Sequence, residues 1–241
     1  MESLPPLLVQ KPWAGKFLAK FYGLQSSDIG EAWLLSTIRE GSDKLNFVVK
    51  IIDAAEPLSV QVHPNDEWAA KLENSKGKTE CWLILDSKPG AGVYLGLREG
   101  VDPSEYEAEL KLNHSVEKFL NFIETKRGDF FVVPAGTVHA IGGGVTLLEV
   151  QQASGITYRL WDWGRLGREL HLDKGLKVLD HKAAFEVRRG VLGSHPQTLL
   201  KHADFTCCYN ESYGRGWFID LETLEVYHAV KPRSKEYIFV H

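Results

Sequence analysis

The sequence is poor in cysteine, in long apolar runs and in clustered basic charge, and each shortage excludes a class of protein. Three cysteines, two of them adjacent at Cys207 and Cys208, cannot form a paired disulfide framework, so we expect a reducing cytoplasm. The longest apolar stretches, such as residues 130–134, are far shorter than the ~20 residues of a membrane-spanning helix. With 28 basic and 32 acidic residues and no basic tract, the chain is expected to bind neither nucleic acid nor a membrane.

What the 241 residues do contain is strand-like alternation, with a hydrophobic fraction of 44% that can form a sizeable core. Helical patterns are fewer, and the best of them has Asp102 as a cap and Pro103 at the first helical position. Many short strands with a few helices predict a mainly β fold, a sandwich or barrel with a helical insertion. The expected strands are 47–52, 58–62, 81–85, 130–133, 146–151 and 157–163, and the expected helices are 66–73, 102–112, 115–122 and 172–179.

The chemically informative part of the chain ends near Arg168. Beyond it the sequence predicts further short strands, but no group of reactive side chains. We therefore expect a catalytic domain with a helical insertion over residues 1–168, and a reduced second β region over 169–241 that packs on the first. The strands expected in this second region are 206–209, 217–221, 226–229 and 237–240.

One local pattern is more specific than the rest, with Gly128, Pro134, Gly136 and His139 at fixed spacing around an apolar run. The run predicts a strand, the proline and second glycine end it, and the histidine begins the next strand. A lone histidine there is more often a hydrogen-bonded core residue than a ligand. The spacing nevertheless resembles the second motif of the cupin superfamily, which implies a jelly-roll β-barrel.

Two further pairs of polar residues make a metal site plausible. Gln61 and His63 are two apart, as are Lys78 and Glu80, so on strands each pair projects to one face. Together with His139 they supply two imidazole nitrogens and two oxygens, a set that suits a divalent first-row metal with a position open for substrate. The alternatives are an ordinary half-buried strand at 60–63 and a solvated pair of Lys78 with Glu80.

Several longer motifs, in the same order along the chain, resemble the cupin-type mannose-6-phosphate isomerases in their short bacterial form. The resemblance spans about residues 10–180 and implies a zinc-dependent aldose-ketose isomerase that interconverts mannose 6-phosphate and fructose 6-phosphate. The motifs are IGEAW at 29–33, VQVHPND at 60–66, GKTECW at 77–82, VPAGTVHA at 133–140, LEVQQAS at 148–154 and TYRLWDWGR at 157–165.

The resemblance also implies which residues hold the metal, with one divalent ion, zinc, per chain. Its four ligands correspond to Gln61, His63, Glu80 and His139. Such a cation would act as a Lewis acid toward the charge that accumulates on two adjacent sugar oxygens in an enediol.

Catalytic and substrate-binding roles are implied for a second set of residues. Lys78, Glu149 and Arg159 correspond to catalytic positions, and either Lys78 or Glu149 could transfer the proton. For the 6-phosphate we expect Arg165, with Lys78 and Arg159, because guanidinium groups suit phosphate geometry. Arg165 could instead only close the end of its strand. The glycines at 142–144 lack the setting of a phosphate loop and predict a tight hairpin.

The chain departs from the family in two places. Gly155 follows Ser154 where an acidic residue is usual, and the second β region is short, which leaves room for a homodimer to cover it. These departures slightly favour the first of two functions that compete with isomerisation, and the second rests on two histidines and a carboxylate, which can also hold iron. The first is a non-catalytic cupin that binds or senses a sugar phosphate, and the second is an iron cupin oxygenase.

Overall fold

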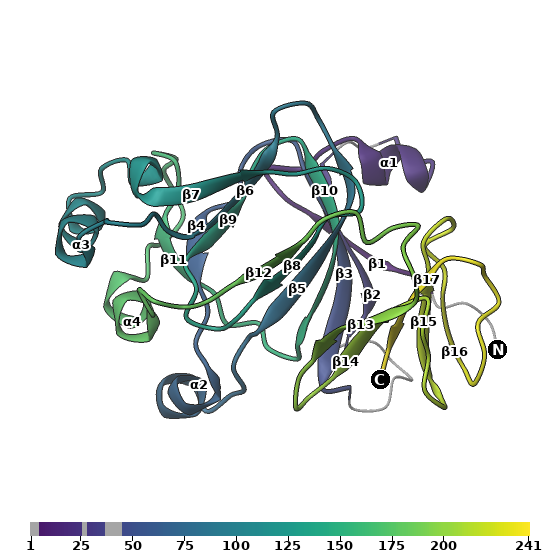
Figure 1. Ribbon diagram of the computed structural model, residues 1–241. Helices are drawn as coiled ribbons and strands as arrows, with labels where there is room; N and C mark the ends of the chain where they lie inside the picture. The colour runs from purple at the N-terminus through teal and green to yellow at the C-terminus, as the bar shows by residue number, and fades with distance from the viewer. Residues whose placement is uncertain (1–4, 26–27, 37–44) are drawn as a thin grey trace.

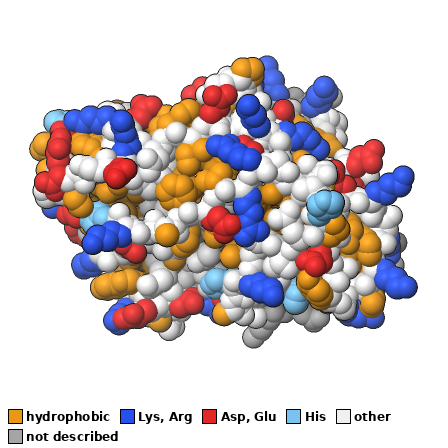
Figure 2. Space-filling view, in the orientation of Figure 1, with side chains coloured by type: hydrophobic (Ala, Val, Ile, Leu, Met, Phe, Trp, Pro, Cys, Tyr) orange, Lys and Arg blue, Asp and Glu red, His pale blue; other side chains and the backbone are white. Residues whose placement is uncertain are grey.

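A computed structural model describes residues 5–25, 28–36 and 45–241 of the chain (Figure 1). Within these residues, seventeen strands form three antiparallel sheets, accompanied by four α-helices and one 3-10 turn. No helix in the described part is long and apolar enough to cross a membrane. On the face in Figure 2, basic, acidic and apolar side chains are interspersed.

Two of the sheets face each other and enclose an apolar core, so the predicted mainly β jelly-roll barrel is confirmed. The larger sheet has the order β1-β2-β3-β10-β5-β8-β12, and the smaller has the order β11-β4-β9-β6-β7. The larger sheet comprises β1 (Leu7–Gln10), β2 (Ile29–Leu35), β3 (Phe47–Ala54), β10 (Val145–Gln152), β5 (Glu80–Ser87), β8 (Phe130–Val133) and β12 (Glu186–Arg188). The smaller comprises β11 (Tyr158–Trp161), β4 (Val60–Val62), β9 (His139–Ile141), β6 (Gly92–Leu97) and β7 (Leu120–Glu124).

The third sheet lies against the outer face of the larger barrel sheet, at the right in Figure 1. Cys81 and Leu83 of β5 share one buried cluster with Cys207 and Ile219 from this sheet. Because both faces of the central barrel strands are covered, β3 and β10 are buried along their whole length. The sheet has the order β13-β14-β17-β15-β16, from β13 (Gln197–Lys201), β14 (Thr206–Tyr209), β17 (Tyr237–Val240), β15 (Gly216–Asp220) and β16 (Val226–Ala229).

This sheet is the reduced C-terminal β extension expected from the sequence, but part of residues 169–241 joins the barrel. Strand β12 pairs with β8 at the edge of the larger sheet. Helix α4 (Leu172–Val178) packs on β11, where Gly175 fits against Leu160. The division at residues 168 and 169 therefore stays a prediction about domains, with the third sheet as its clearest separate part.

Two of the four α-helices in the described residues begin at a side-chain cap. The Asn65 side chain accepts the Trp68 N–H at the start of α2 (Asp66–Glu73), and Asp102 caps α3 (Pro103–Lys111) in the same way. The helix predicted over 115–122 is wrong, since only a 3-10 turn, Glu117–Phe119, precedes β7. This segment has a weak cap, and pairing with β6 satisfies its backbone instead. Helix α1 (Phe17–Phe21) was not predicted.

The hairpin predicted at the three consecutive glycines is also wrong. β9 ends at Ile141 in one barrel sheet and β10 begins at Val145 in the other, so the turn between them crosses from sheet to sheet. Glycine is needed because a Cβ at Gly142 would overlap the carbonyl oxygen of Gly92.

We expect Gly142→Ala to lower the free energy of unfolding by about 2 kcal/mol, because the overlap is with backbone and cannot be relieved by a side-chain rotation. Urea unfolding followed by tryptophan fluorescence measures the change. Gly155→Ala is the matched control, since a Cβ there has nothing within 4 Å and its φ is not positive. Equal stability of the two variants would contradict this account of the turn.

Candidate functional site

Strand register in the smaller barrel sheet brings three of the predicted site residues side by side. Gln61 of β4 lies directly opposite Arg159 of β11 on one side and His139 of β9 on the other. Residues that are directly opposed on neighbouring strands project to the same face of the sheet. The row Arg159, Gln61, His139 is therefore a product of pairing between segments nearly 100 residues apart.

Backbone hydrogen bonds join three loops, around residues 63–64, 78 and 136, next to the remaining ligand candidates. The Gly136 N–H donates to the His63 carbonyl at 2.8 Å, and the Lys78 N–H donates to the Pro64 carbonyl at 3.0 Å. Gly136 has a φ of 87°, which explains why a glycine stands two residues after Pro134 in this turn. These bonds place His63, just past β4, opposite the start of β5, where Glu80 lies.

The four predicted metal ligands converge at this point. His63 Nε2 lies 3.2 Å from Glu80 Oε1, and His139 Nε2 lies 3.9 Å from Glu80 Oε2. One ligand atom from each of these three buried residues lies within 4.8 Å of the others. Gln61 Nε2 is 3.2 Å from His139 Nε2, so the amide borders the same point.

The pKa values of the residues in this cluster favour the binding of a cation. Burial and the positive charge of Lys78 lower the pKa of His63 to about 3, and burial also lowers that of His139. Burial alone would raise the pKa of Glu80, but Lys78 and His63 hold it well below its ordinary value. His139 Nδ1 lies 2.9 Å from the Thr137 carbonyl, and donating to it leaves the Nε2 lone pair for a metal. Neutral imidazoles with one carboxylate fit a divalent ion.

These shifts predict how the stability of the metal-free protein depends on pH. In the unfolded chain both histidines take up a proton near pH 6.5, whereas in the folded chain His63 resists protonation until about pH 3. The unfolded state therefore binds more protons as pH falls from 6.5 toward 3, and we expect stability to be lost across that range. Calorimetric Tm values at pH 7.5 and 5.0, after chelation, measure the effect.

The comparison is with a His63→Asn/His139→Asn double variant, in which this loss of Tm should be smaller. The variant is needed because burial, together with the charge of Glu80, raises the pKa of Glu149, and that shift acts in the opposite direction. A wild-type Tm that rises on acidification, relative to the double variant, would contradict the prediction.

Lys78 is part of the buried cluster and not a solvated neighbour of it. Its Nζ lies 2.8 Å from Glu80 Oε1 and 3.3 Å from His63 Nε2, and the residue is 5% exposed. The alternative of an exposed pair on a hairpin is therefore wrong. The Lys78 ammonium therefore lies beside the ligand atoms, where it would also contact a substrate oxygen.

Glu149 lies in the larger barrel sheet, on the strand next to that of Glu80, and it is paired with a lysine that the sequence analysis missed. Lys50 of β3 is directly across from Glu149 of β10, and Lys50 Nζ lies 2.9 Å from Glu149 Oε1. Burial opposes the charge on Lys50, yet the carboxylates of Glu149 and Glu31 raise its pKa. Lys50 Nζ also lies 5.6 Å from the centroid of the Trp33 ring. The available signal was a basic residue in the middle of the otherwise mostly apolar run FVVKIIDA.

These groups border two adjoining hollows of about 170 and 250 Å³ inside the barrel. The hollows share Lys11, Glu31, Lys50, Lys78 and Thr157. Gln61, Glu149, Arg159 and Arg168 line the smaller one. One cavity thus brings together a ligand candidate, a buried carboxylate and several cations.

The two arginines after Arg159 differ in position. Arg165 donates from Nη2 to the Pro57 carbonyl at 2.7 Å and to Asp162 at 2.8 Å, outside the lining of the two hollows. This matches the alternative in which Arg165 closes the end of its strand. Arg168, which was not predicted, pairs with Asp162 and lines the smaller hollow. A substrate-binding role for Arg165 stays a prediction.

The fold and the site together define a cupin barrel with a candidate metal site and a charged internal cavity. A family model described as phosphomannose isomerase type I, catalytic domain, matches residues 16–82. The mannose-6-phosphate isomerase ManA of Bacillus subtilis is 34% identical over 240 residues, covering 85% of this chain and 75% of its own. A mannose-6-phosphate isomerase of Streptococcus mutans is 33% identical, covering 72% and 67%. The chain belongs to the mannose-6-phosphate isomerase family.

Solved structures agree with this assignment. The mannose 6-phosphate isomerase of Bacillus subtilis superposes with a TM-score of 0.74 at 25% identity, covering 99% of this chain and 93% of its own. A mannose 6-phosphate isomerase bound with zinc and yttrium shares the fold at a TM-score of 0.64 and 16% identity, covering 99% and 94%.

Proposed function

We propose that this chain is a zinc-dependent isomerase that interconverts mannose 6-phosphate and fructose 6-phosphate. Family membership supports the reaction, and relatives at 33–34% identity bear the name of that isomerase. The observation that carries the proposal is the convergence of His63, Glu80 and His139 beside a hollow lined by Glu149 and Arg159. A module that only binds a sugar phosphate is not favoured, because its named relatives are enzymes.

Gln61, His63, Glu80 and His139 would hold the metal. Two imidazoles, a carboxylate and an amide oxygen form the donor set that zinc accepts, and a position remains for water or a sugar oxygen. When bound, the ion supplies Lewis-acid stabilisation to negative charge on the sugar oxygens. Zinc is the proposed metal among the first-row cations that this donor set accommodates.

Glu149 is the proposed proton carrier. The reaction removes a proton from C2 of mannose 6-phosphate and delivers one to C1, while the proton of the C2 hydroxyl passes to the C1 oxygen, with an enediol between the two sugars. A carboxylate can accept the first proton and return it to the adjacent carbon without leaving its place. Lys50 fixes the carboxylate at 2.9 Å, and burial raises the pKa of Glu149 toward that of an effective base.

Lys78 and Arg159 are the proposed partners of the sugar oxygens. Both line the smaller hollow, and Arg159 keeps its charge through the reaction because a guanidinium does not lose its proton. Lys78 adds a compact ammonium beside the ligand atoms. For the phosphate we propose Arg159 and Lys78 with Arg168, which borders the same hollow, and Arg165 as the outer cation.

The direct test combines metal analysis and a coupled isomerase assay on one preparation. About one zinc per chain and turnover of mannose 6-phosphate are the expected results. A fully metal-loaded protein that shows melting shifts with the sugar phosphate but no turnover would overturn the proposal and select the binding module. Oxygen consumption on adding iron would select the oxygenase.

Arg159→Ala is expected to lower kcat by about 10²–10³-fold while the zinc content stays unchanged. The reason is that the guanidinium stabilises charge that develops in the transition state but holds no metal. The coupled assay and plasma mass spectrometry measure the two quantities. Arg98→Ala is the control, since Arg98 bonds to the carbonyl of Lys118 away from the site. Loss of zinc from Arg159→Ala would contradict the assigned role.

A further inference from the structure

Two residues of the segment after β11, Glu169 and His171, hold Arg159 through three hydrogen bonds. The Glu169 carbonyl accepts a hydrogen bond from Arg159 Nη1 at 2.7 Å. His171 Nδ1 accepts the Arg159 backbone N–H at 3.0 Å, and the His171 backbone N–H donates to the Arg159 carbonyl at 2.8 Å. Backbone and side chain of the proposed catalytic arginine are thus held by two residues that line none of the barrel hollows described above.

These hydrogen bonds are needed because Arg159 lies on an edge strand of the sheet. Strand β11 is the edge of the smaller barrel sheet, so half of its backbone groups have no strand to pair with. At Arg159 the outward N–H and carbonyl both pair with His171, which takes the place of a missing neighbour strand. Without that partner the edge would be free to fray at the residue that faces the substrate cavity.

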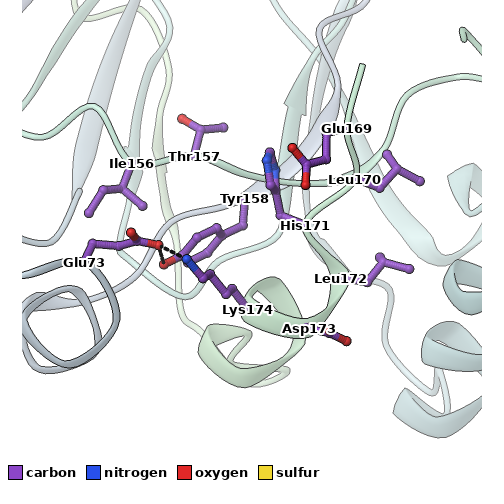
Figure 3. Close-up of a pocket in the computed structure, with 10 residues that line it drawn as sticks. All are labelled: Glu73, Ile156, Thr157, Tyr158, Glu169, Leu170, His171, Leu172, Asp173 and Lys174. Carbon is purple, nitrogen blue, oxygen red and sulfur yellow. Dashed lines mark hydrogen bonds and ion pairs between the residues drawn. The ribbon is translucent and has the colours of Figure 1, made fainter. Parts of the chain in front are cut away.

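His171 itself is well anchored. Its carbonyl accepts the Gly175 N–H at 2.8 Å at the start of α4, and Gly175 packs against Leu160 of β11. Figure 3 shows the His171 ring beside Glu169, on the wall of a cavity of about 580 Å³ that contains none of the metal-ligand candidates. The ring centroid lies 6.3 Å from that of Tyr158.

We propose that His171 is a positioning residue for the isomerase, acting through Arg159. Its Nδ1 lone pair fixes the Arg159 backbone, and the Glu169 carbonyl fixes one end of the guanidinium. Arg159 Nε is buried without a hydrogen-bond partner among the described residues, so this donor is left for a sugar oxygen. The inference rests on the proposed function, because it assumes that Arg159 contacts the substrate.

The test compares three substitutions of His171 in the zinc-loaded 241-residue chain. His171→Leu removes the acceptor and is expected to lower kcat about tenfold, with zinc content unchanged. His171→Asn places an amide oxygen near the Nδ1 position and is expected to keep most of the activity. His171→Gln, whose oxygen lies further out, should resemble leucine and serves where the leucine variant does not fold. His181→Leu is the matched control, since His181 lies in the turn after α4 and contacts Glu107.

A double-mutant cycle distinguishes positioning from a general structural effect. In an Arg159→Ala background, His171→Leu should lower kcat no further, because the group it positions is gone. An equal loss in both backgrounds, or wild-type kcat in the leucine and glutamine variants, would overturn the inference while leaving the isomerase activity intact. If the zinc-loaded wild type itself has no turnover, it is the proposed function that fails.

Discussion

Replacing Glu80 with glutamine is expected to strip the metal from the protein and to lower kcat by at least ~10³-fold. Glu80 supplies the one negative charge among the four proposed ligands and lies 3.2 Å from His63 and 3.9 Å from His139. An amide keeps the shape but removes the charge that attracts a divalent cation. It also leaves the buried Lys78 without the carboxylate 2.8 Å away, so Tm should fall as well.

Plasma mass spectrometry after dialysis and the coupled assay measure the two losses. Glu80→Asp, which keeps the charge on a shorter arm, should recover part of the metal content at high zinc concentration. Glu73→Gln is the control, since Glu73 ends helix α2 and pairs with Lys174 at the surface. A glutamine variant that holds a full equivalent of zinc would show that Glu80 is not a ligand.

Much of the fold could be predicted because its strands are short apolar runs bounded by turn residues. Residues 130–133, 206–209, 226–229 and 237–240 were predicted with the bounds that the structure has. The error over 115–122 shows the limit of this approach. In that segment pairing with β6 decided the structure, and such pairing leaves no local mark in the sequence.

The sequence could predict only those parts of the site that follow from the alternation of side chains along a strand or from the family resemblance. Spacing by two placed Gln61 with His63, and Lys78 with Glu80, on common faces, and the family resemblance supplied His139. Neither the spacing nor the resemblance could reveal that one cross-strand row is formed by Arg159, Gln61 and His139, because the register is set only when the strands pair.

Lys50 and His171 were missed for related reasons. Lys50 is the one basic residue of a mostly apolar strand, and only its pairing with Glu149 on the neighbouring strand β10 indicates a role for it. His171 contacts Arg159 through an edge of the sheet, twelve residues along the chain. A residue that hydrogen-bonds to the edge strand of a sheet from a neighbouring segment has no sequence motif by which it could be recognised.

Glu149→Gln is expected to lower kcat by about 10³-fold with zinc content and KM little changed, because an amide cannot accept the C2 proton. Lys78→Met is expected to cost less, about 10–10²-fold, since it removes charge stabilisation and leaves the base in place. Both residues line the smaller hollow, so geometry alone gives each of them access to the substrate. The ratio of the two losses therefore tests which one moves the proton.

Deuterium incorporation from D₂O into the sugar phosphate gives a sharper readout than turnover. If Glu149 is the carrier, the glutamine variant loses incorporation at C1 and C2, while the Lys78→Met variant continues to exchange at a reduced rate. Lys50→Met is the companion variant, because Lys50 holds Glu149 at 2.9 Å but is not proposed to transfer a proton. Exchange that persists in Glu149→Gln and vanishes in Lys78→Met would assign the proton to the lysine. The carboxylate would then serve to hold Lys50 within the barrel wall.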